Sequence, residues 1–258
     1  MNSPLAYIGG KSILSKTIVK LIPSHITYCE AFTGGGWMLF RKEPSKAEII
    51  NDLDRDLVAF YRVIQNHLEE FLKQFKWLLT SREMFEDFKE QLEVRGLTDI
   101  QRAARYYYVQ RTCFAGKVRG RTFGVSSDRK PRINLVRMEE ELSEVHLRLS
   151  QVLIENLSWD EFISRYDRPA TFFYLDPPYY KKPVYKHNFE SIDDFIRMRD
   201  ILKGLKGKFI LSINDHPEIR EVFNGFRMVP VSLNYTAGME VTAGRELIIG
   251  NVPLKLAG

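Results

Sequence analysis

The sequence of 258 residues contains little cysteine and no long apolar run, and each absence excludes a class of protein. Cys29 and Cys113 are too few for a disulfide framework and are not spaced as a metal-binding pair. His187 and His216 have no second ligand at suitable spacing, so we expect no metal site. No stretch approaches the roughly 18–20 apolar residues of a membrane span, and the first eleven residues lack the apolar core of a signal peptide. We therefore expect a soluble, intracellular protein without a membrane partner.

The positive charge is gathered in one part of the chain. Between Arg102 and Arg137 there are ten lysines and arginines against the single acid Asp128, a net charge of +9, whereas the remainder carries −4 of the total of +5. Such segregation is typical of a surface that binds a polyanion. A solvated basic face is the alternative.

Residues 171–175 are a run of apolar and β-branched residues that stops at Asp176-Pro177-Pro178-Tyr179. The run predicts a buried strand, and the tandem prolines end it. Open α/β sheets bind ligands at the carboxyl ends of their strands. There the Asp176 carboxylate and the Pro177 carbonyl could accept the two hydrogens of one exocyclic amino group, and the Tyr179 ring could stack on a planar base. An ordinary surface turn is the alternative.

A strand, a glycine turn and a helix follow one another in the N-terminal part. Residues 26–30 predict a strand, Gly34-Gly35-Gly36 form the turn, and Trp37 begins a helix. This order is typical of the first unit of a Rossmann-like nucleotide fold. The turn could serve a nicotinamide dinucleotide or S-adenosylmethionine, and the absence of the G-x-G-x-x-G spacing favours the latter.

The next predicted strand, residues 47–51, ends at Asp52, eighteen residues after Gly34. Rossmann-like folds place there the acid that hydrogen-bonds ribose hydroxyls. Asp54 and Asp56 are competing candidates, and both could instead cap the following helix.

Two further regions carry candidate binding residues. Tyr7-Ile8-Gly9-Gly10-Lys11 precedes a helical pattern over residues 12–21, and a glycine pair there suits close approach to a ligand. Residues 54–150 are mostly helical in pattern, but the periodicity fails between Phe114 and Leu135, where glycines interrupt arginines and lysines. We interpret that segment as a β-hairpin or loop whose arginines suit guanine edges and phosphates. Further strands are predicted at 152–156, 208–213, 226–233 and 245–250.

Taken together, four motifs resemble those of the Dam-type (D12 class) DNA adenine-N6 methyltransferases. They are residues 7–11, Glu30-Ala31-Phe32-Thr33-Gly34-Gly35-Gly36, Asn51-Asp52 and residues 176–179, in the order and at the spacing of that family. The resemblance covers nearly the whole chain. It implies an α/β fold with a Rossmann-like, seven-stranded methyltransferase sheet in residues 1–55 and 150–258. Residues 56–149 would form an inserted, mainly helical target-recognition lobe that carries a β-hairpin.

The resemblance also implies the function and the site. The enzyme would transfer a methyl group from S-adenosylmethionine to adenine N6 in double-stranded DNA, at a specific sequence and by base flipping. The expected catalytic residues are Asp176, Pro177, Pro178 and Tyr179. The expected cofactor-binding residues are Tyr7, Gly10, Lys11, Glu30, Phe32, Gly34, Gly35, Gly36, Asp52, Asn156, Leu157 and Asp176. The expected DNA-binding residues are Lys117, Arg119, Arg121, Arg129, Lys130 and Arg132.

One segment departs from the family pattern. In residues 113–119, Ala115 and Lys117 stand where relatives usually carry asparagine and leucine, while Arg119 matches a base-reading arginine. The departure leaves the recognised DNA sequence open. We expect a monomer in the cytoplasm of a bacterium or encoded by a phage. The alternatives are a cytosine-N4 methyltransferase and a catalytically idle DNA-binding protein.

Overall fold

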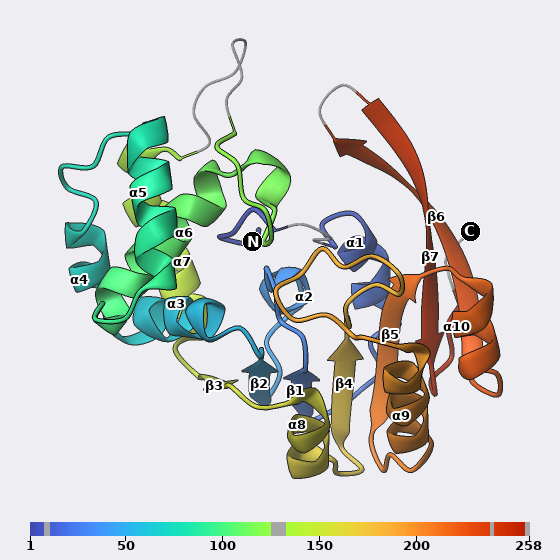
Figure 1. The fold of residues 1–258 in the computed structure, drawn as a ribbon. Coiled ribbons are helices and arrows are strands. Elements are labelled where there is room, and N and C mark those ends of the chain that lie inside the picture. Colours follow the sequence, from blue (N-terminus) through green and yellow to red (C-terminus); the bar gives the residue numbers. More distant parts are fainter. Residues whose placement is uncertain (8–10, 125–132, 238–239, 256–258) are drawn as a thin grey trace.

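The computed structural model describes residues 1–7, 11–124, 133–237 and 240–255. Within them lies one sheet of seven strands (Figure 1). The strands are β1 (Thr27–Glu30), β2 (Ala47–Asn51), β3 (Val152–Glu155), β4 (Thr171–Leu175), β5 (Lys208–Asn214), β6 (Arg227–Ala237) and β7 (Glu240–Gly250). All the strands predicted from the sequence are present, and β6 and β7 are longer than expected.

One helix separates most successive strands from β1 to β6, a block of five helices lies between β2 and β3, and β7 follows β6 directly. They are α1 (Leu14–Ile18), α2 (Trp37–Arg41), α3 (Arg55–Asn66), α4 (Leu68–Lys73), α5 (Arg82–Glu93), α6 (Asp99–Thr112), α7 (Leu135–Leu149), α8 (Trp159–Tyr166), α9 (Ile192–Lys203) and α10 (Pro217–Val222), with 3₁₀ turns η1 (Val19–Leu21) and η2 (Phe114–Gly116). No helix of the described residues is long and apolar enough to cross a membrane.

The strand order is β3-β2-β1-β4-β5-β7-β6. The first five strands pair in parallel, and β7 then runs antiparallel to both β5 and β6. Strand β4 lies in the middle, and all five of its residues are buried, which explains its unbroken apolar run. Burial of Phe172 or Phe173 contributes roughly 1.5–3 kcal/mol each. The parallel strands therefore present their carboxyl ends along one edge, where β4 delivers Asp176.

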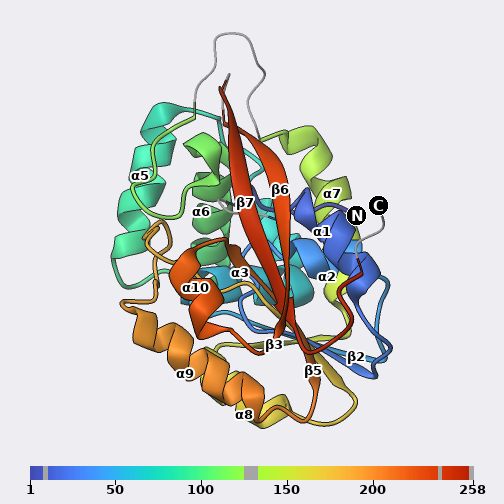
Figure 2. The ribbon, with the colours of Figure 1, turned by 90° about the vertical axis from the view of Figure 1, so that its right-hand side faces the viewer.

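Helices cover both faces of the sheet (Figure 2). One core cluster joins Tyr28 and Phe172 to α1, α2 and α3, and the other joins Phe173 and Leu211 to α8, α9 and α10. The result is a three-layer arrangement, which confirms the α/β fold class expected from the sequence.

Five helices, α3 to α7, lie between β2 and β3 in the chain and rise beyond the carboxyl ends of the strands (Figure 1). Their aromatic core includes Phe60 stacked on Tyr107, with ring centroids 5.5 Å apart. Tyr106, Tyr107 and Tyr108 are all buried. This core is continuous with the one beneath α1 and α2, so the inserted helices and the sheet share one hydrophobic interior.

The structure describes only part of the segment interpreted as a β-hairpin or loop. Residues 114–116 form the turn η2, and a single antiparallel bridge joins Cys113 to Phe123. Ala115 and Gly116 both have left-handed backbone angles, with φ of +56° and +65°, which interrupts any extended strand. Residues 125–132, the remainder of the predicted hairpin, lie outside the described residues.

Candidate active site

A cavity of about 300 Å³ opens at the carboxyl ends of the central parallel strands. This volume is at the lower end of the range of roughly 300–1,000 Å³ that is typical of small-molecule sites. Residues that the sequence predicted line it, namely Tyr7, Lys11, Glu30, Phe32, Gly34, Gly35, Gly36, Asp52, Leu157, Asp176 and Pro178. The structure thus brings together side chains from motifs that are up to 170 residues apart in sequence. Gly10 lies outside the described residues.

The glycine loop between β1 and α2 forms one wall of the cavity. Gly34 and Gly36 have φ of +48° and +69°, a region that other residues rarely adopt. A Cβ atom at Gly34 would lie 3.1 Å from the Tyr7 ring. The Tyr61 hydroxyl of α3 donates a hydrogen bond to the Gly34 carbonyl at 2.9 Å. The loop is therefore held between α3 and the N-terminal segment.

Asp52 lies at the end of β2 and binds the same loop. Its Oδ2 accepts a hydrogen bond from the Gly34 amide at 2.9 Å, and its Oδ1 accepts one from the Asp54 amide at 3.0 Å. Burial raises the pKa of Asp52 to about 6, although these two backbone N–H groups favour the ionised form. Asp54, one of its competitors, is the N-cap of α3 and accepts from the Asp56 amide. Each oxygen of Asp52 keeps capacity for a further donor.

Asn51 holds three strand ends together, a role that the sequence did not reveal. Its Nδ2 donates to the Ala31 carbonyl at 3.0 Å and to the Leu157 carbonyl at 3.1 Å, and its Oδ1 accepts from the Leu157 amide at 2.8 Å. Asn156, predicted to line the cavity, instead donates to the Asp52 carbonyl at 2.7 Å. Asn156 therefore orients Asp52, while Leu157 lines the cavity.

Glu30 ends β1 inside the cavity and is almost completely buried. Burial raises the pKa of Glu30 to about 8, and the Tyr28 hydroxyl, which donates to its Oε2 at 3.2 Å, lowers it in part. The charge of Asp176 also raises the pKa of Glu30. Phe32 follows and packs edge-on against Phe189, with ring centroids 6.1 Å apart. The cavity thus combines acidic and aromatic walls.

Asp176 reaches the cavity directly from the end of β4. Its Oδ1 lies 3.1 Å from Lys11 Nζ and accepts a hydrogen bond from Ser212 Oγ at 3.3 Å. Burial raises the pKa of Asp176 to about 6, while the ammonium of Lys11 lowers it and the carboxylate of Glu246 raises it. One-fifth of the Asp176 side chain remains exposed, and that part faces the cavity.

The rest of the Asp-Pro-Pro-Tyr segment is held by contacts with Lys11 and Glu246. Pro177 is buried, and Pro178 lines the cavity. The Tyr179 hydroxyl accepts a hydrogen bond from Lys11 Nζ at 2.6 Å and donates one to Glu246 Oε1. The Lys11 ammonium lies 4.4 Å from the centre of the Tyr179 ring. These contacts with the hydroxyl fix the orientation of the Tyr179 ring, and the residue stays half-exposed.

The loop after Tyr179 crosses to the inserted helices. Lys186 Nζ lies 3.2 Å from Asp54 Oδ1 and 2.9 Å from Asp56 Oδ2, at the start of α3. Burial lowers the pKa of Lys186, but the two carboxylates raise it by more, so the pKa lies above its ordinary value. Lys186 and its neighbours Tyr185 and His187 line the cavity. Lys186 therefore ties this loop to the start of α3.

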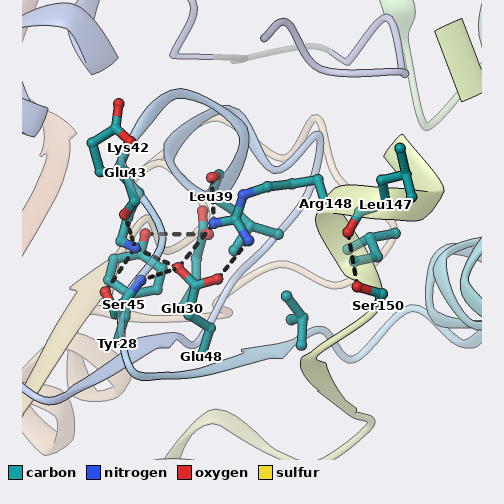
Figure 3. Close-up of polar contacts among 12 residues, drawn as sticks. Tyr28, Glu30, Leu39, Lys42, Glu43, Ser45, Glu48, Leu147, Arg148 and Ser150 are labelled. Atoms are coloured by element: carbon teal, nitrogen blue, oxygen red, sulfur yellow. Dashed lines mark hydrogen bonds and ion pairs between the residues drawn. The ribbon is translucent and has the colours of Figure 1, made fainter. Parts of the chain in front are cut away.

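A buried network of ion pairs lies near Glu30 (Figure 3). Glu48 of β2 lies between Lys42 Nζ at 2.5 Å and Arg148 of α7, whose Nη1 and Nη2 contact its two oxygens at 2.5 and 2.8 Å. Arg148 Nη2 also donates to the Leu39 carbonyl at 3.0 Å. The Lys42 ammonium lies 4.3 Å from the centre of the Tyr28 ring. The network connects α7, at the end of the inserted helices, to β1 and β2.

The predicted DNA-binding residues lie in different environments. Arg119 is exposed, whereas Lys117 and Arg121 are half-buried. The Arg121 guanidinium lies 5.2 Å from the centre of the Tyr106 ring on α6. The ammonium nitrogen of Lys117 lies 5.7 Å from the centre of the Phe114 ring. Arg129, Lys130 and Arg132 lie outside the described residues. Of the three described residues, Arg119 is the one that projects into solvent.

These features together define a Rossmann-like α/β enzyme of the methyltransferase class: a parallel sheet, a glycine loop with an acid at the end of the next strand, and an Asp-Pro-Pro-Tyr segment at the end of β4. The model of the D12 class N6 adenine-specific DNA methyltransferase family matches residues 7–237. The chain belongs to this family and is a DNA adenine-N6 methyltransferase.

Three relatives align with this chain over most of both lengths. The Type II methyltransferase M1.LlaDCHI of Lactococcus lactis subsp. cremoris is 28% identical over 272 residues, which cover 95% of this chain and 93% of the relative. The Type II methyltransferase M.CviBI of Paramecium bursaria Chlorella virus NC1A is 27% identical, with 88% of each chain covered. The DNA adenine methylase of Escherichia coli strain K12 is 24% identical, with 82% of this chain and 80% of the relative covered.

Proposed function

We propose that the enzyme transfers a methyl group from S-adenosylmethionine to N6 of an adenine flipped out of double-stranded DNA, at a specific sequence. The observation that carries this proposal is the position of Asp176. Its carboxylate faces the same cavity as Asp52 and the Gly34 loop. An acceptor for an amino group and a binding site for a nucleoside are therefore adjacent.

The residues of the cavity fit S-adenosylmethionine chemically. The Asp52 carboxylate can accept hydrogen bonds from ribose hydroxyls, and Phe32, Leu157 and Trp159 offer apolar surface to an adenine ring. Asp176 is an acid at the end of the cavity nearer Lys11, and its charge favours a cationic ligand. When bound there, S-adenosylmethionine supplies a sulfonium-activated methyl group, so no nucleophilic residue is required.

The acceptor is held by the end of β4. Flipping the adenine costs a few kcal/mol, and the flipped base must be bound by the site. Within the described contacts, Lys11 and Ser212 bind Asp176 Oδ1, so Oδ2 can accept a hydrogen from the amino group. The Pro177 carbonyl accepts the second hydrogen, and the Tyr179 ring stacks on the base. As the amino nitrogen gains positive charge, the Asp176 carboxylate stabilises it.

Arg119 reads a base in this proposal, because it is exposed and matches the family's base-reading arginine. Lys117 and Arg121 then support the reading loop through their contacts with Phe114 and Tyr106. Arg129, Lys130 and Arg132 add positive charge for phosphates. The enzyme acts as a cytoplasmic monomer, and sedimentation with and without DNA tests its oligomeric state.

The experiment is a methylation assay with isotope-labelled S-adenosylmethionine and double-stranded plasmid DNA, followed by digestion to nucleosides and mass spectrometry. We expect labelled N6-methyldeoxyadenosine. Labelled N4-methyldeoxycytidine would support the cytosine alternative, and unlabelled DNA that is nevertheless bound would support the idle DNA-binding alternative. Methylation-sensitive sequencing of the product then gives the recognised sequence.

A further inference from the structure

Glu246 is a buried acid beside the catalytic segment that none of the sequence motifs includes. It lies in β7, beyond the region that the family model matches, and is 1% exposed. Its Oε2 accepts a hydrogen bond from Lys11 Nζ at 3.0 Å, and its Oε1 accepts one from the Tyr179 hydroxyl. A buried carboxylate thus contacts two of the predicted site residues directly.

Lys11 joins Glu246 to Asp176. Its ammonium lies 3.1 Å from Asp176 Oδ1 and also donates to the Tyr179 hydroxyl at 2.6 Å. The hydroxyl can play both parts because it carries one donor and two acceptor positions. Three separate segments, the one before α1, the end of β4 and β7, therefore meet in one polar cluster: Lys11, Asp176, Tyr179 and Glu246.

The charges of this cluster do not balance. One ammonium faces two carboxylates, so with both acids ionised the cluster carries one net negative charge. The side chains of Lys11 and Glu246 are 3% and 2% exposed, whereas the side chain of Asp176 is 20% exposed, toward the cavity. An excess buried charge is costly unless a cation approaches it. The reaction proposed above brings positive charge to this place, on the amino nitrogen as it accepts a methyl group.

We propose that Glu246 is a positioning residue of the methyl transfer. It orients the Tyr179 ring through the hydroxyl, holds Lys11 against Asp176, and supplies the excess negative charge that stabilises the cationic reacting centre. This inference rests on the proposed function, because the reacting centre is the adenine amino group.

The charge of Glu246 should affect the titration of Asp176. The groups that face Asp176 are Lys11 from the N-terminal segment, Glu246 from β7, Tyr174 from β4 itself, Glu30 from the neighbouring β1, and Ser212 from β5. Glu246 raises the pKa of Asp176, and Lys11 lowers it. Glu246→Gln keeps the shape and a hydrogen-bond acceptor but removes the charge. The pH below which turnover fails should then shift downward, while turnover at neutral pH falls.

The experiment measures kcat, KM for S-adenosylmethionine and folded fraction between pH 5 and 8.5 on plasmid DNA. We expect Glu246→Gln to lower kcat at pH 7.5 by about tenfold or more and to change KM much less. The acid limb of the plot of kcat against pH, where turnover falls as the pH decreases, should move to lower pH. Tyr179→Phe removes the hydroxyl but leaves the ion pair between Glu246 and Lys11. We expect this variant to have a lower kcat, and the acid limb of its kcat profile should lie near that of the wild type. Glu221→Gln, an exposed acid in α10, is the control for loss of charge.

An acid limb of Glu246→Gln that coincides with that of the wild type overturns the proposal, as does a loss of kcat that only follows the folded fraction. If Glu246→Gln does not fold, Glu246→Asp provides the test, because it keeps the charge and withdraws the carboxylate by one methylene. The expected result is then a lower kcat with an unshifted acid limb, and a wild-type kcat overturns the proposal. A wild-type enzyme that methylates no DNA would refute the proposed function instead, so the two failures are distinguishable.

Discussion

Gln110 donates a hydrogen bond from Nε2 to the Ala6 carbonyl at 2.6 Å and thereby ties helix α6 to the segment that carries Tyr7. The same Nε2 donates to the Gly116 carbonyl at 2.9 Å, in the turn that begins the basic loop. Gly116 packs so closely that a Cβ atom on it would lie 2.8 Å from the Ala6 carbonyl carbon and from the Tyr7 nitrogen. The loop expected to read DNA and the wall of the cofactor cavity are therefore in direct contact.

Gly116→Ala tests this contact. The added methyl group would press on the backbone of Ala6 and Tyr7, and overpacking of this kind costs about 1–3 kcal/mol. We expect binding of S-adenosylmethionine to weaken by roughly fivefold or more, measured by calorimetry on the DNA-free protein. Gly120→Ala is the matched control, because Gly120 has φ of +59° but no heavy atom within 4 Å of the added Cβ. Equal losses in both variants would show that backbone strain, and not the contact, is responsible.

The order of the elements followed from local patterns in the sequence. The glycine turn, Asp52 at the end of β2 and the buried run of β4 each depend on residues within a few positions of one another, so their places could be predicted. Strands at 226–233 and 245–250 were predicted from local patterns too, and in the structure they belong to the antiparallel pair β6 and β7. Glycines and arginines alone do not distinguish a hairpin from an irregular loop after Phe114, and both interpretations stay open because residues 125–132 lie outside the described residues.

Long-range partners could not be predicted in this way. Asn51 reaches Leu157, Lys186 reaches Asp54 and Glu246 reaches Lys11, and each pair is separated by more than 100 residues. A lone Glu in an apolar strand gives no sign of its partner. Asn156 was expected in the cavity, but its side chain points to the Asp52 backbone, which depends on the direction of the loop after β3.

Asp52→Ala should weaken S-adenosylmethionine binding by about 1.5–3 kcal/mol, the scale of a hydrogen bond to a charged group, without moving the sequence preference. Calorimetry measures the dissociation constant. Asp54→Asn is the control, because an asparagine can still cap α3 and Asp54 is the neighbouring acid. An unchanged dissociation constant in Asp52→Ala, with a loss in Asp54→Asn, would transfer the ribose role to Asp54.

Arg119→Ala should cost about 1–3 kcal/mol on the preferred site and relax the preference at one base pair, as expected for a bidentate contact with guanine. Arg121→Ala should instead lower methylation of all sequences alike, because its guanidinium packs on Tyr106. Methylation rates on a panel of single-base variants of the recognised site distinguish the two. If Arg121→Ala changes the preferred base and Arg119→Ala does not, the two roles are reversed.

The buried network around Glu48 should dominate the acid stability of the fold. Burial favours the neutral acid, but the hydrogen bonds from Arg148 and Lys42 prevail and lower the pKa of Glu48 below its ordinary value. The stabilisation is therefore present above about pH 4.3, the pKa of an unfolded glutamate, and is lost as the pH falls through the folded value. Arg148→Ala should lower the free energy of unfolding at pH 7 by up to about 3–5 kcal/mol, because it removes one of the two cations that pair with the buried Glu48 carboxylate.

Urea denaturation at pH 7 and at pH 4 measures this effect. Arg165→Ala is the control, because Arg165 pairs with Glu161 at 2.9 Å on the surface, where both side chains are about half exposed. Such a pair contributes only about 0–1 kcal/mol. Similar losses in the two variants would contradict the structural role assigned to the buried network.

The central claim is that the Asp176 carboxylate acts on the amino group to be methylated. The most direct test is the single-turnover rate of methyl transfer to DNA by Asp176→Ala at saturating S-adenosylmethionine, with the dissociation constant of the donor measured on the same preparation. Removal of the group that stabilises the developing charge should lower the rate by at least ~10²-fold, while the donor still binds within several-fold of its wild-type affinity. A wild-type rate in Asp176→Ala, with donor binding intact, would contradict the account.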